Sequence, residues 1–113
     1  MKKLLLFVFI GFVFIGSASA YYCDGNALLT AWAEYKKIFD NDTKYYNGPT
    51  MWFSGYVTGA VDAMDGYLIS IPPGTGAKQL CAIVGRYLDA HPELWDQGGM
   101  LIIYKAIMEF YPK

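Results

Sequence analysis

Apolar residues recur with a helical period through nearly all of residues 21–113, and no run alternates in the way that a half-buried β-strand does. The stripes fall on four stretches, each with polar residues on the opposite side, which is the pattern of an amphipathic helix. The first stretch should begin after Asp24, a good N-cap residue, and Thr50 should cap the second. The third should end near His91, because Pro92 follows and suits the first position of another helix. The sequence therefore predicts an all-α, compact bundle of four to five helices.

The last stretch, from about Met100 to Tyr111, is apolar nearly all round and leaves only Lys105 and Glu109 as a polar strip. Such a helix is either the central helix of a bundle or part of a subunit interface. In the second stretch, Gly55 and Gly59 lie one turn apart, and each costs about 1 kcal/mol of helix stability relative to Ala. We therefore expect these glycines to permit a close helix crossing. Both features also fit a homodimer face.

Residues 1–20 have the order of a secretory signal peptide. Two lysines precede an apolar run from Leu4 to Ile15, and the small residues Ala18-Ser19-Ala20 follow as a cleavage site. The run is shorter than the about 20 residues that span a bilayer. We expect cleavage after Ala20, with a retained signal anchor as the alternative. The expected product is one exported domain, residues 21–113, without a membrane segment.

The charge balance of residues 21–113 argues against nucleic acid as a partner. Without the leader and its two lysines, seven Lys and Arg face ten Asp and Glu, a formal charge of −3. A protein that binds a phosphate backbone needs a dense basic patch, and these cations are scattered. All ten Tyr and all three Trp lie in this part of the chain, and such rings are enriched in protein contact surfaces.

No arrangement of residues typical of catalysis or metal binding is present. His91 is the sole histidine, and an imidazole at a helix end commonly hydrogen-bonds nearby backbone groups. Asp62 and Asp65 can lie side by side on a helix, where solvated charge is the common role. One histidine and two cysteines also lack a fourth zinc ligand. We predict no metal, no cofactor and no enzymatic activity, with an enzyme acting through Asp62, Asp65 or His91 as the alternative.

Cys23 and Cys81 are the only cysteines, and an exported chain meets an oxidising compartment. We expect a disulfide between them that ties the start of the first helix to the third, with a stabilisation of about 4 kcal/mol. In the alternative, Cys81 is a small buried hydrophobe and Cys23 a free thiol.

Five stretches in the same order resemble the Rap1a/Tai family of periplasmic immunity proteins, which protect bacteria from type VI secretion amidase effectors. These stretches are Asp24–Leu29, Gly55–Ala63, Ile71–Thr75 with Gln79-Leu80, Val84–Glu93, and Ala106-Ile107 with Phe110–Pro112. The resemblance implies a periplasmic helical protein, often dimeric, that plugs the peptidoglycan-binding groove of the effector and performs no chemistry. The family usually carries cysteines at four places where this chain has none, so the resemblance makes Cys23 and Cys81 a substitute pair.

The segment between Gly66 and Gly76 cannot be regular helix, because its two prolines lack amide donors and restrict the residues before them. A rigid loop loses little entropy on binding. We therefore expect two contact elements for the effector, with plain helix connectors as the alternative for each. Their residues are Ser70, Ile71, Pro72, Pro73, Gly74 and Thr75 in the loop, and His91, Pro92 and Glu93 at the corner. The alternative function is a periplasmic chaperone-like or structural binding protein without a toxin partner.

Overall fold

The protein is a bundle of four α-helices and one short 3₁₀ helix in the part of the chain that the computed structural model describes, residues 22–41 and 48–112. The helices are α2 (Gly25–Asn41), α3 (Gly48–Met64), α4 (Ala77–Ala90), η1 (Pro92–Leu94) and α5 (Gly99–Phe110). No strand occurs among the described residues, so the predicted all-α fold is confirmed. The predicted signal peptide, residues 1–20, lies outside the described residues.

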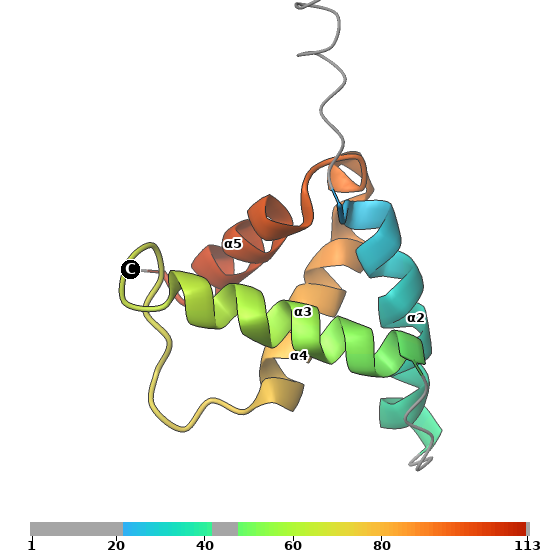
Figure 1. Cartoon of the computed structure of the whole chain (residues 1–113), viewed down its shortest axis with the longest axis horizontal. Coiled ribbons are helices and arrows are strands. Elements are labelled where there is room, and N and C mark those ends of the chain that lie inside the picture. The colour runs from blue at the N-terminus through green and yellow to red at the C-terminus, as the bar shows by residue number, and fades with distance from the viewer. Residues whose placement is uncertain (1–21, 42–47, 113) are drawn as a thin grey trace, which may run out of the picture.

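Helix α3 crosses α4 in front of it in Figure 1, with α2 and α5 on either side. The chain enters the bundle beside the turn that leads into α5. There the amide of Gly25 donates to the carbonyl of Gln97 at 2.9 Å, and the amide of Gly99 donates to the carbonyl of Cys23 at 2.8 Å. The first and last helices are thus held together at their N-terminal ends.

Local signals set several helix ends as predicted. The carboxylate of Asp24 accepts a hydrogen bond from the amide of Ala27 at 2.9 Å and caps α2. Helix α4 ends with His91 as its C-cap, before Pro92. The prediction for Thr50 was wrong: α3 begins at Gly48, and Thr50 lies inside it with 1% of its surface exposed. Pro49 occupies the first turn, where a missing amide costs no hydrogen bond.

The core is centred on an aromatic cluster where α2, α3 and α4 meet. The Trp32 and Phe53 ring centroids lie 5.7 Å apart, and those of Tyr35 and Phe53 lie 5.5 Å apart. The indole nitrogen of Trp32 donates to the carboxylate of Asp89 at 3.0 Å. A Cβ on Gly85 would lie only 2.2 Å from the Trp32 ring, so glycine at this position lets the ring lie against α4.

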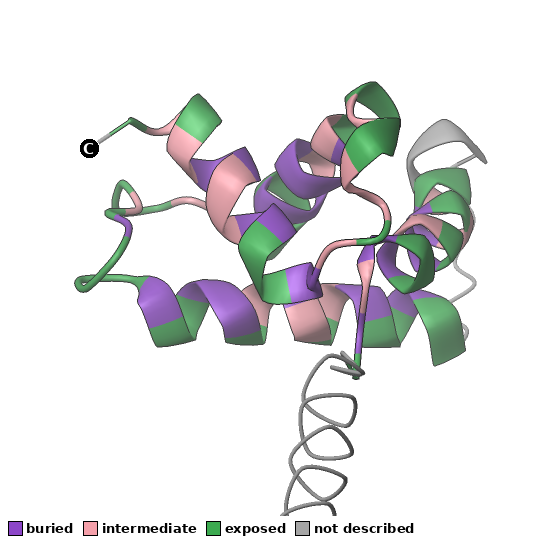
Figure 2. Ribbon diagram, turned by 90° about the horizontal axis from the view of Figure 1, so that it is seen from above, coloured by how far each residue is buried: buried purple, intermediate pink, exposed green. Residues whose placement is uncertain are grey.

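The close approaches between helices do not involve Gly55 and Gly59. Both are exposed, and a Cβ on either would meet no atom within 4 Å, so the expected close crossing at these glycines is absent. Exposed and buried residues alternate along α3 as its sides turn away from and towards the other helices (Figure 2). The close contacts lie instead at Gly25 against Trp95, at Gly85 against Trp32, and at Gly99 against Tyr56 and Cys23. Gly55 and Gly59 therefore belong to the outer surface of α3.

The disulfide expected between Cys23 and Cys81 is not formed. Both thiols are free and buried, with 4% and 0% of their surface exposed. Cys23 hydrogen-bonds with Tyr56, whereas Cys81 hydrogen-bonds with Tyr35 and Ser54. Ser54 and Tyr56 are two residues apart on α3 and so point to different sides of it, which separates the two thiols. Burial raises the pKa of both thiols, so each is held in its unreactive, protonated form.

Candidate functional site

The segment between α3 and α4 stands out from the bundle as an ordered loop (Figure 1). Gly74 has a φ of +87°, and the amide of Thr75 donates to the carbonyl of Pro72 at 3.3 Å. The hydroxyl of Thr75 donates to the same carbonyl at 2.7 Å. With proline second and glycine third, these residues have the chemistry of a type II turn. The turn that was predicted as a contact element is therefore fixed by its own hydrogen bonds, with Pro72, Pro73 and Gly74 exposed.

The base of the loop is anchored in the core by Ile69, which is fully buried. The carboxylate of Asp65 accepts a hydrogen bond from the amide of Ile71 at 3.0 Å, which gives one of the two paired aspartates a structural role. Gly66, with a φ of +86°, lets the chain reverse after α3.

Tyr67 and Leu68 are exposed to 80% and 56% at this reversal. Sequence reasoning missed these two residues. Large apolar residues placed after the helical stripe has ended, and next to a proline turn, were the available signal.

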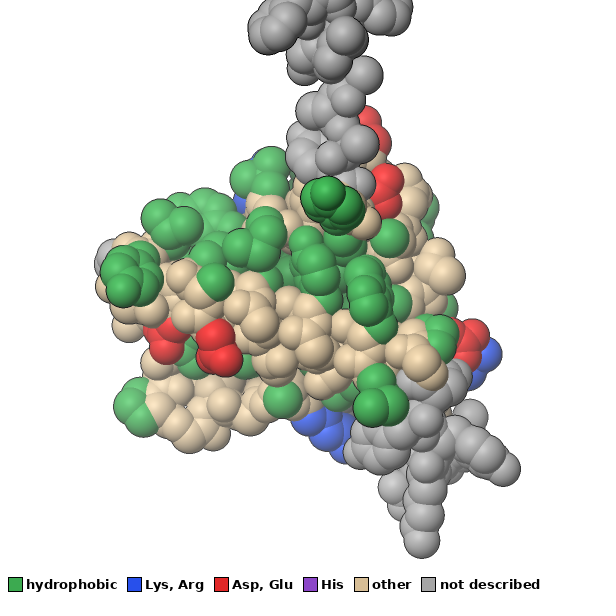
Figure 3. All heavy atoms as spheres, viewed as in Figure 1, with side chains coloured by type: hydrophobic (Ala, Val, Ile, Leu, Met, Phe, Trp, Pro, Cys, Tyr) green, Lys and Arg blue, Asp and Glu red, His purple; other side chains and the backbone are tan. Residues whose placement is uncertain are grey.

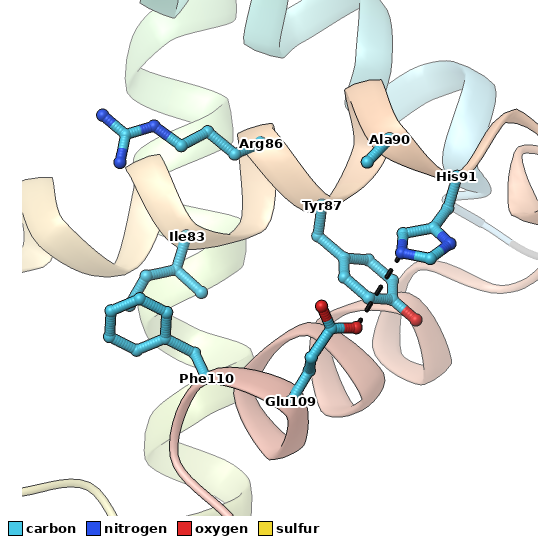
Figure 4. A pocket seen from close by; sticks show the side chains of 7 residues that line it. All are labelled: Ile83, Arg86, Tyr87, Ala90, His91, Glu109 and Phe110. Atoms are coloured by element: carbon cyan, nitrogen blue, oxygen red, sulfur yellow. Dashed lines mark ion pairs between the residues drawn. The ribbon is translucent and has the colours of Figure 1, made fainter.

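The predicted corner at the other end of α4 is a compact charged cluster. Nδ1 of His91 lies 2.8 Å from a carboxylate oxygen of Glu93, and this hydrogen bond lowers the pKa of Glu93. Nε2 of His91 lies 3.8 Å from a carboxylate oxygen of Glu109 on α5 (Figure 4). The imidazole also contacts the Tyr87 ring, with centroids 4.1 Å apart. The histidine thus connects α4, η1 and α5 through contacts at the surface.

The structure does not bring the loop and the corner together. The loop leads into the first residue of α4 and the corner follows its last, and a helix of 14 residues is about 21 Å long. Between them, α4 and α5 enclose a groove of about 180 Å³, which runs along α4 from Ile83 to His91 (Figure 4). The two predicted elements therefore lie at opposite ends of α4, and the groove lies beside the helix between them.

The sequence model of the Rap1a immunity proteins matches residues 23–112. The chain belongs to the Rap1a immunity protein family. No curated protein and no solved structure matches it. The matched range includes all four described α-helices, so the loop, the corner and the groove all lie within the Rap1a region.

This Rap1a protein also carries an apolar face where α3 meets the start of α5 (Figure 3). Two adjoining hollows of about 430 and 450 Å³ share Tyr56 and Met100, and no charged residue lines either of them. Gly55 and Gly59 form part of the floor of one hollow. Large apolar side chains stand exposed around them, namely Met51, Trp52, Met100 and Leu101.

The described residues contain no group of three or more His, Cys, Asp or Glu that could hold a metal ion. Asp62 is exposed, and the carboxylate of Asp65 is engaged by the loop backbone. None of the helices in the described ranges is both long and apolar enough to cross a membrane.

Proposed function

We propose that this protein is a periplasmic immunity protein that binds a type VI secretion peptidoglycan amidase effector and occludes its substrate cleft. The observation that carries the proposal is the match to Rap1a immunity proteins over residues 23–112. The predicted signal peptide and the predicted absence of enzymatic activity agree with it. The amidase class rests on the resemblance to the Rap1a/Tai family.

The loop supports the proposal because its shape suits a plug. Its turn is already ordered by the two hydrogen bonds from Thr75 to Pro72, so little conformational entropy is lost when a cleft closes around it. The exposed side chains of Tyr67 and Leu68 add apolar surface next to the turn. We propose that Ser70–Thr75 enter the cleft and that the corner of His91, Pro92 and Glu93 contacts its rim.

We further propose that the apolar face on α3 and α5 joins two copies of the chain. A two-fold interface needs a surface that is complementary to itself. This face offers exposed Trp52 and Met100 side chains beside hollows floored by glycine, so each copy could fill the hollows of the other. The glycine-bearing helix and the last helix, both expected at a homodimer face, contribute to it.

Co-expression in the periplasm tests the proposal. The full-length protein, with its leader, is produced together with exported candidate amidases, and lysis is followed by turbidity. The leaderless chain starting at Tyr21 is the matched control, because it has the same domain in the wrong compartment. We expect the full-length protein to prevent lysis by its cognate amidase and the leaderless chain to fail. Lysis by every candidate amidase at the same rate with and without the exported protein would contradict the proposal.

A further inference from the structure

The groove between α4 and α5 has the size of a pocket for one side chain. Its volume is about 180 Å³. Sites for small molecules and cofactors usually measure about 300–1,000 Å³. A cofactor or a glycan chain is therefore too large for this groove, whereas a single long side chain from a partner fits.

The walls of the groove suit a cation. Tyr87 is half-buried and Phe110 is 55% exposed, so two aromatic side chains line the groove (Figure 4). Ile83 is buried beside them. Aromatic faces attract a guanidinium or ammonium group that lies within about 6 Å of the ring centre. A flat guanidinium can also stack on such rings.

The carboxylate of Glu109 is open to a new partner. Its side chain is 67% exposed, and its distance of 3.8 Å from Nε2 of His91 is too long for a hydrogen bond. Nδ1 of the same ring already contacts Glu93 at 2.8 Å, and a neutral imidazole has only one N–H to donate. His91 therefore leaves Glu109 without a hydrogen bond unless the ring is protonated.

Two basic residues lie near the groove: Arg86 lines it, and Lys105 contributes to the lowered pKa of Glu93. Arg86 points away from Glu109 and His91 (Figure 4), and Lys105 lies one turn before Glu109 on α5. Among the described residues, neither cation forms an ion pair with a carboxylate within 4.0 Å. Burial, and then the carboxylates of Glu109 and Glu93, raise the pKa of Tyr87. The two carboxylates thus act on the Tyr87 hydroxyl in the direction that a cation bound in the groove would oppose.

The groove lies beside α4, between the loop at one end of this helix and the His91 corner at the other. At its loop end, the side-chain amide of Gln79 donates to the hydroxyl of Tyr111 at 3.1 Å, and at its other end lies the His91 corner. A protein that contacts both the loop and the corner covers the groove between them.

We propose that this groove receives a basic side chain, an arginine in the first place, from the surface of the protein partner. The guanidinium stacks against Tyr87 and pairs with the carboxylate of Glu109, which can accept two parallel N–H bonds. This inference takes one point from the proposed function, namely that the partner is a protein. The recognition chemistry can be tested without the effector.

The test uses Nα-acetyl-arginine amide as the probe and Nα-acetyl-citrulline amide as its neutral isostere, titrated into the protein purified after export. Nuclear magnetic resonance follows the signals of Tyr87 and Phe110. For a ligand of this size a Kd of about 1 mM is expected. We expect the citrulline compound to bind at least about tenfold more weakly, a difference of about 1.4 kcal/mol. Equal shifts with both compounds, or no shift with either, would overturn the proposal.

Two charge variants locate the effect. Glu109→Gln should weaken the arginine probe about fivefold to tenfold. Asp62→Asn removes the same charge from the exposed surface of α3 and should leave binding unchanged. Equal weakening by both variants would mean a general charge effect and would refute the groove. If the protein binds the arginine probe but blocks no amidase, this inference holds and the proposed function is refuted. If the protein blocks an amidase but does not bind the probe, the proposed function holds and this inference is refuted.

Discussion

Substituting Gly74 by Ala tests whether the shape of the loop turn contributes to stability and to effector binding, without changing the packing of the helices. Gly74 has a φ of +87°, a conformation that costs an L-residue about 1–2 kcal/mol. No atom lies within 4 Å of the Cβ that alanine would add, so the whole cost comes from the backbone. If the turn keeps its shape, the free energy of unfolding falls by about 1–2 kcal/mol. If the turn rearranges, the hydrogen bonds from Thr75 to Pro72 are lost and stability falls less.

In the second case the strain returns when the effector forces the turn back into shape. The losses in stability and in binding free energy should therefore add up to about 1–2 kcal/mol, which is a factor of about 5–30 in an equilibrium constant. Urea denaturation followed by circular dichroism gives the first loss, and calorimetry with the cognate amidase gives the second.

Gly76→Ala is the matched control for this experiment. Gly76 has a φ of −85° and a ψ of 158°, which alanine adopts freely, and an added Cβ meets no atom within 4 Å. Losing glycine as the N-cap of α4 and stiffening the unfolded chain offset each other to within about 0.5 kcal/mol. If Gly74→Ala matches Gly76→Ala in both stability and binding, the turn geometry does not matter and the reasoning is refuted.

Three further predictions concern the core. Gly85→Ala should lower the free energy of unfolding by about 2–3 kcal/mol, because the new Cβ lies 2.2 Å from the buried Trp32 ring. Gly59→Ala, on the exposed side of α3, should raise the free energy of unfolding by about 1 kcal/mol in the monomer. Equal effects of the two variants in denaturant titrations would contradict this packing. Cys23 and Cys81 should react with a thiol reagent only after unfolding, and a reductant should leave the melting temperature unchanged; a reductant-sensitive melting temperature would point to the disulfide after all. Burial, and then the charge and hydrogen bond of Cys23, raise the pKa of Tyr56 from 10.0 to about 12, so its share of stability is present below pH 10 and is lost as the pH rises to about 12. Tyr56→Phe should reduce the loss of stability in this alkaline range, and an unchanged pH profile would contradict the burial of the phenol.

The helical frame follows from signals that lie close together in the sequence. The cap by Asp24, the end of α4 before Pro92 and the turn with Gly74 each depend on a few neighbouring residues. The prediction of Thr50 as a helix cap was wrong because the glycine and proline before it start the helix two residues earlier. A cap residue predicts a helix start only where the preceding residues do not themselves fit the first turn.

Features that depend on which helices meet could not be read from the sequence. Gly85 opposes Trp32 although 53 positions separate them, and Gly55 and Gly59 have no helix opposite them. The same applies to the cysteines, because the side of α3 that each thiol faces follows from the packing of three helices. The groove, too, joins residues of α4 and α5 whose proximity no local pattern indicates.

Inhibition of a purified amidase tests the central claim most directly. The amidase whose lysis the exported protein prevents in the periplasm is purified and assayed for cleavage of peptidoglycan while the exported protein is titrated into it. Cleavage should stop near equimolar protein. Gly76→Ala should leave the inhibition curve in place, and Gly74→Ala should shift it to higher concentration by the part of the about 1–2 kcal/mol that is not lost from stability. Undiminished cleavage in the presence of excess wild-type protein would contradict the account.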